Sequence, residues 1–130
     1  MPIYTVANLE FELSNGHEVI RMGGPYICDV RLNDELIIEK CLSHNFVYDE
    51  RSILFFLQYH KINFYEYFTI NFYQIPTKET YQFTREFEMV YLGSLISDHE
   101  LEIFHAFHDG FREKSSVFNL DEEDFILLDS

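Results

Sequence analysis

Lysine and arginine are scarce in this sequence: nine stand against 23 Asp and Glu, which gives a formal net charge of −14 over 130 residues. Phosphate backbones and anionic membrane surfaces are bound through clustered cations, so we expect neither nucleic acid nor a membrane as a partner. The excess of acids favours a basic protein partner, because complementary fields accelerate encounter. Solubility alone is the alternative explanation for such a charge.

Long apolar runs are also missing. No run approaches the roughly 18 residues of a membrane-spanning helix. The N-terminal segment MPIYTVANLEFEL lacks the basic stretch and the long apolar stretch of a signal peptide. We therefore expect no signal peptide and a cytoplasmic location.

Signatures of catalysis and of cofactor binding are not found either. Gly23 and Gly24 lack the further glycines, the lysine or the following helix of a phosphate-binding loop. There is no GxSxG nucleophile motif, and the two cysteines form no CxxC pair. We therefore expect a protein that is not an enzyme and that holds no cofactor.

Cysteine is limited to Cys28 and Cys41, both in apolar, strand-like surroundings. We expect free, buried thiols, which are typical of a reducing compartment. A disulfide between neighbouring strands is the alternative.

Aromatic residues, in contrast, are abundant, with 14 Phe and 9 Tyr but no Trp. Phe and Tyr favour strands, and turn signals recur roughly every 8 to 12 residues, a spacing typical of antiparallel sandwiches and barrels. We expect one domain over residues 1–130 with a mostly β fold: an antiparallel meander forming a sandwich or barrel, with at most one short helix. The expected strands cover residues 9–13, 17–22, 26–32, 36–41, 46–48, 52–60, 64–75 and 81–91, with turns at 14–16, 43–45 and 93–94 among those between them.

The stretch 97–108 has two interpretations. Ser97 and Glu100 have the spacing of a capping box, which would begin a helix. His105 and His108 would then share a face and could bind a metal ion. We favour a strand ending at a turn at 109–110, on which these histidines point to opposite faces and hold no metal. The apolar run 125–128 is expected to dock as a last strand or turn.

Acidic residues are distributed along the whole chain. Pairs such as Glu86 and Glu88 share a strand face and could serve general acid–base chemistry, but with 23 acids we favour a solvent-facing role. Carboxylates beside exposed tyrosines match a surface of Arg and Lys. The candidate partner-binding residues are Glu86, Glu88, Glu100, Glu102, Asp121, Glu122, Glu123 and Asp124.

Residues 21–92 carry a resemblance to a known class. They contain a Met22–Tyr26 corner, a hairpin over 26–41, an apolar strand at 52–60 and two long aromatic strands. In these features the chain resembles bacterial immunity proteins of the polymorphic and contact-dependent growth inhibition toxin systems. The resemblance implies a cytoplasmic monomer that forms a heterodimer with a cationic toxin domain, foremost a nuclease, and blocks its active site. It carries over no binding residue.

Two other interpretations stay open. The Phe and Tyr side chains could line the cavity of a β-barrel that binds a small molecule or lipid, or of a barrel-type enzyme. A structural module would instead form stable homo-oligomers, against which the high like charge works.

Overall fold

The computed structural model describes residues 3–6, 9–18, 26–32, 35–49, 53–88, 90–106 and 112–129. Within these ranges the chain forms antiparallel strands and no helix, which confirms the expected fold class. The strands are β1 (Ile3–Val6), β2 (Leu9–Glu18), β3 (Tyr26–Leu32), β4 (Glu35–Asp49), β5 (Ile53–Ile62), β6 (Tyr65–Gln74), β7 (Glu79–Phe87), β8 (Val90–Ser97), β9 (Glu100–Ala106), β10 (Arg112–Asn119) and β11 (Phe125–Asp129).

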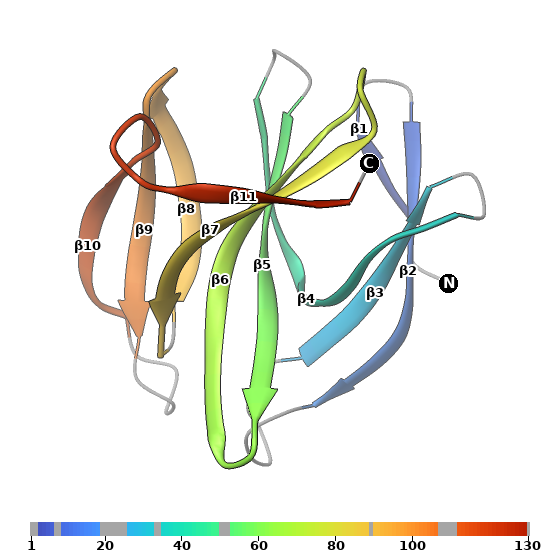
Figure 1. Ribbon diagram of the computed structural model, residues 1–130, viewed down its shortest axis with the longest axis horizontal. Coiled ribbons are helices and arrows are strands. Elements are labelled where there is room, and N and C mark those ends of the chain that lie inside the picture. The colour runs from blue at the N-terminus through green and yellow to red at the C-terminus, as the bar shows by residue number, and fades with distance from the viewer. Residues whose placement is uncertain are drawn as a thin grey trace.

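The strands form two sheets. Eight of them follow the order β1-β2-β3-β4-β5-β6-β7-β11, and three follow the order β10-β9-β8. Figure 1 shows β8–β10 on one side of the central strands β5–β7, and β2 and β3 on the other. The favoured strand interpretation of 97–108 is confirmed over 100–106, while 107–111 lie outside the described residues.

The core lies on both faces of β5 and β6. Alternate residues of a strand point to opposite faces, so Phe55 packs into a cluster with the small sheet while Phe56 packs into a second cluster with β2–β4. The ring of Phe11 on β2 lies 6.4 Å from that of Tyr73 on β6. Because β2 and β6 are separated by three strands in the sheet order, this contact requires the large sheet to curl over itself.

The hairpin expected at 14–16 is wrong, because these residues lie inside β2. Ser14 pairs with Asp29 and His17 pairs with Ile27, so three residue steps on β2 match two on β3. The extra residue is accommodated as a β-bulge, and pairing with β3 continues through it. Of the strand expected at 17–22, residues 19–22 lie outside the described part of the chain.

The break expected at 43–45 is also wrong, because β4 runs without interruption from Glu35 to Asp49. The polar residues fall in an irregular part of the strand, where the register with β5 shifts between Cys41 and Phe46. Lys40, with φ of 55°, immediately precedes the shift. At this irregularity β4 changes its main pairing partner: the first half pairs with β3 and the second half with β5.

The strand expected over 81–91 ends earlier, at Phe87, and β8 begins in the other sheet at Val90. Gly93 does not end a strand but lies within β8. A Cβ atom there would come within 2.7 Å of Glu102 Oε1 and 2.8 Å of Phe104 Cε2. Glycine is therefore used here for a close approach of side chains from β9 rather than for a turn.

Candidate functional site

The turn that joins β5 to β6 carries the most exposed large apolar side chain among the described residues. Ile62 pairs with Tyr65, so the turn consists of Asn63 and Phe64. Asn63 has φ of 56°, a conformation that asparagine tolerates better than most residues. The Phe64 side chain is 99% exposed, and its neighbours Ile62 and Tyr65 are exposed as well. We call residues 62–65 the hairpin tip; it lies at the lower end of the molecule in Figure 1.

Aromatic rings and a carboxylate support this tip. The Tyr65 ring stacks on Tyr67 at 5.0 Å, and Tyr67 stacks on His60 at 4.8 Å. The Tyr65 hydroxyl donates a hydrogen bond of 2.8 Å to Glu86 Oε1 on β7. This hydrogen bond is the main cause that raises the pKa of Tyr65, and the charge of Glu88 contributes in the same direction. Glu86 and Glu88, both predicted as partner-binding residues, therefore lie beside an exposed tyrosine.

A chain of polar side chains runs from His60 into the sheet. His60 Nε2 lies 2.9 Å from Thr69 Oγ1, which donates to Asn71 Oδ1 at 2.8 Å. Asn71 Nδ2 donates to Gln58 Oε1 at 2.9 Å, and Gln58 Nε2 donates to the Glu39 carbonyl at 3.0 Å. Burial, the largest cause, lowers the pKa of His60, so its neutral form is favoured. These contacts hold the base of the hairpin in one arrangement.

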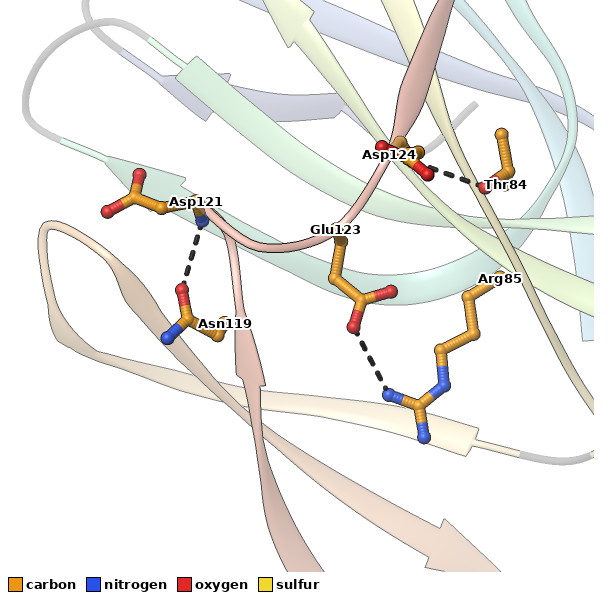
Figure 2. A network of polar contacts seen from close by, with 6 residues as sticks. All are labelled: Thr84, Arg85, Asn119, Asp121, Glu123 and Asp124. Atoms are coloured by element: carbon orange, nitrogen blue, oxygen red, sulfur yellow. Dashed lines mark hydrogen bonds and ion pairs between the residues drawn. The ribbon is translucent and has the colours of Figure 1, made fainter.

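The acidic segment 121–124 connects β10 to β11 and lies against β7 (Figure 2). The Asp121 amide donates to Asn119 Oδ1 at 3.1 Å, and Arg85 Nη1 lies 3.5 Å from Glu123 Oε2. The main-chain oxygen of Asp124 accepts hydrogen bonds from Thr84, from the amide at 2.9 Å and from the hydroxyl at 3.4 Å. Asp121 Oδ2 also lies 2.6 Å from a ring nitrogen of His99. The carboxylates of Asp121 and Glu123 thus have partners within the chain, while the side chains of Glu122 and Asp124 are exposed.

The remaining candidates, Glu100 and Glu102, lie on β9. Glu100 Oε1 accepts a hydrogen bond of 3.1 Å from Ser97 Oγ across the turn that precedes the strand. Glu102 lies across the strand pair from Gly93 and fills the space left by its missing side chain. The structure therefore brings only Glu86 and Glu88 together with the hairpin tip.

Phe64 and Tyr65 are the candidate residues that the sequence did not reveal. The expected strand 64–75 included both, and strand alternation cannot show that one end of a hairpin projects into solvent. The available signal was Asn63, a residue that favours turns, between the two expected strands 52–60 and 64–75.

A second feature, apart from the hairpin tip, is a cavity of about 310 Å³ that is lined by residues of β4, β5, β6, β7 and β11. Its polar lining comes from Glu39, Gln58, Asn71 and Thr80. Its apolar lining comes from Leu36, Ile37, Ile38, Phe56 and Leu128.

Where the structure describes the chain, no three His, Cys, Asp or Glu side chains are arranged to hold a metal ion. His105 lies on β9, and His108 lies outside the described residues. No helix of sufficient length and apolarity to cross a membrane occurs in the described ranges.

Comparisons with protein-family models, with curated proteins and with solved structures find no match to this chain.

Proposed function

We propose that this protein is an immunity protein: an inhibitor that is not an enzyme and that binds a cationic toxin domain, foremost a nuclease, and blocks its active site. The observation that carries the proposal is the hairpin tip, where a fully exposed Phe64 stands beside the Tyr65–Glu86 pair and Glu88. The protein would act as a monomer that forms a heterodimer with its toxin.

The chemistry of the tip matches a basic cleft. A nuclease active site binds a polyanion and therefore presents Arg and Lys. Guanidinium groups can pair with the carboxylates of Glu86 and Glu88 and lie over the faces of tyrosine rings. Phe64 would enter the cleft, where the removal of its ring from water stabilises the complex. Exposed aromatic anchors of this kind dominate the energetics of many interfaces.

The supporting contacts lower the entropic cost of binding. Stacking of Tyr65 on Tyr67 and of Tyr67 on His60 holds the rings in place before a partner arrives. Ordered side chains lose less freedom on association. The net charge of −14 would steer the encounter with a basic partner over longer distances.

Co-expression with the products of neighbouring genes tests this proposal. We expect one of them to be toxic alone, to be neutralised by this protein and to copurify with it. Phe64→Ser should leave the fold intact, because the ring is exposed, and should weaken the complex by about 2 kcal/mol, roughly 30-fold. Val117→Ser on β10 is the control, since Val117 is also exposed and apolar.

Two outcomes would overturn the proposal. One is that no neighbouring gene encodes a toxic or secreted protein and no cationic protein copurifies. The other is that a neutralised toxin binds the Phe64→Ser variant as tightly as the wild type, which would place the contact elsewhere.

A further inference from the structure

The strand β11 ends the eight-stranded sheet and presents an apolar run to solvent. In the sheet formed by the described residues, β11 follows β7 and is the last strand in the order. Phe125, Ile126 and Leu127 are each 50% exposed, and Leu128 is 42% exposed. An edge strand with exposed apolar side chains is a template on which another chain can pair.

The hydrogen-bond pattern identifies which main-chain groups face outward. The Thr84 amide donates to the Asp124 carbonyl, so residues 84 and 124 form a hydrogen-bonded pair. Hydrogen-bonded and non-bonded pairs alternate along an antiparallel ladder, and the register continues with Phe125 opposite Phe83 through Leu127 opposite Tyr81. The amide and carbonyl groups of Phe125 and Leu127 therefore point away from β7, toward the open edge.

The cavity lies beside this edge. Leu128 on β11 forms part of its lining, together with Leu36, Ile37 and Ile38 of β4. Figure 1 shows β11 crossing the molecule toward the side on which β3 and β4 lie. In strand addition, main-chain hydrogen bonds supply affinity and pockets for alternate side chains supply specificity. This edge offers outward main-chain groups and a cavity of about 310 Å³ for a side chain.

We propose that the outer edge of β11 and the adjacent cavity bind an extended segment of a basic partner protein as an added strand. The segment would alternate apolar residues, one of which enters the cavity, with Lys or Arg. That this partner is the toxin depends on the function proposed above; the docking itself does not.

Charge decides between a basic partner and a second copy of this chain. The apolar run is bounded in the sequence by the acids at 121–124 and by Asp129. Antiparallel pairing of two β11 strands would place these acids of one copy beside those of the other. Like charges opposite one another destabilise a strand pair, whereas a basic segment meets acids at both ends.

A synthetic peptide tests the docking on the full-length protein. The probe is an eight-residue peptide with blocked ends in which Lys and Val alternate, titrated into isotope-labelled protein and followed by NMR. We expect chemical shift changes at 125–128 and 36–39, and slower hydrogen exchange of the Phe125 and Leu127 amides. A peptide with Glu in place of Lys should not bind.

Two modifications separate strand addition from charge attraction. The same peptide with N-methyl groups on alternate residues keeps its charge but loses one edge of donors, and we expect at least tenfold weaker binding. Leu127→Pro should leave the fold intact, since proline is tolerated on an edge strand. Because it removes an outward amide that β7 does not use, it should weaken peptide binding similarly. Leu128→Ser should weaken binding several-fold, and Val117→Ser should not.

Several results would overturn the inference. These are equal binding of the methylated and unmethylated peptides, shift changes confined to other strands, and a homodimer that Leu127→Pro abolishes. A small molecule that copurifies in the cavity would also overturn it. If the peptide fails while Phe64→Ser still disrupts toxin binding, this inference is wrong and the proposed function stands. If the peptide binds and no toxin is found, this inference stands and the proposed function is wrong.

Discussion

The side-chain amide of Asn45 on β4 binds both main-chain groups of Leu92 on β8. Asn45 Nδ2 donates to the Leu92 carbonyl at 3.2 Å, and the Leu92 amide donates to Asn45 Oδ1 at 2.8 Å. The two strands belong to different sheets, so one side chain replaces a missing ladder contact between them. Asn45 lies where the register of β4 shifts, so the irregular part of this strand provides the link between the two sheets.

Replacement of Asn45 by Ala should lower the free energy of unfolding by about 2 to 3 kcal/mol. Each lost hydrogen bond contributes about 1 kcal/mol, and leaving the Leu92 groups without partners adds a desolvation cost. Chemical denaturation of both proteins measures the difference. Asn119→Ala is the control, because it removes a similar amide contact at an exposed turn and should cost less than about 1 kcal/mol. Equal losses in the free energy of unfolding for the two variants would show that the Asn45 link between the sheets stabilises the protein no more than a contact at an exposed turn.

The two cysteines should be inert to thiol reagents in the folded protein. Cys28 and Cys41 are directly opposite on β3 and β4, both are buried thiols outside any disulfide, and their Sγ atoms lie 3.8 Å apart. The contact with Cys28 and then burial raise the pKa of Cys41, and the thiolate is the reactive form. We expect no reaction of the folded protein with a disulfide reagent at pH 8 during the time in which both thiols of the denatured chain react. Rapid modification of the native protein would show that β3 and β4 open readily.

The sequence predicted strand content well and strand ends poorly, for physical reasons that individual residues illustrate. Near-continuous apolar and aromatic runs predicted β5 and β6, and their residues do face cores on both sides. Local turn chemistry misled at Asn15-Gly16, where pairing with β3 before and after a bulge outweighed the turn preference of the dipeptide. Gly93 predicts the end of a strand, whereas in the structure it lies within β8 and allows the close approach of Glu102.

The candidate site was predictable in part for the same reasons. Alternation within the expected strand 81–91 predicted that Glu86 and Glu88 are neighbours, although β7 ends at Phe87 and Glu88 follows it. The contact of Glu86 with Tyr65 spans 21 residues of sequence, and only the pairing of β6 with β7 creates it. Nor could alternation show that Asp121 finds a partner in His99, in the turn before β9, and Glu123 in Arg85 on β7.

His60 should make the protein less stable in acid. Burial lowers its pKa from the ordinary value of 6.5, so below pH 6.5 the unfolded chain binds a proton more readily than the folded protein does. The contribution of His60 to stability is therefore complete above about pH 6.5 and is lost as the pH falls. His60→Gln removes the titration and can keep a hydrogen bond to Thr69. We expect its stability to decline less than that of the wild type between pH 7 and 5; parallel profiles would contradict the assignment.

Charge at the hairpin tip should affect toxin association more than equal charge elsewhere. The double variant Glu86→Gln, Glu88→Gln and the double variant Glu122→Gln, Asp124→Asn each remove two exposed carboxylates. If the tip enters a basic cleft, the first should slow association and speed dissociation of the toxin found by co-expression. The second should only slow association slightly, through the long-range field. All association rates should fall as salt rises, because fields are screened over about 8 Å at physiological ionic strength. Stopped-flow kinetics measure both rates, and identical behaviour of the two variants would mean that total charge, not the hairpin tip, governs recognition.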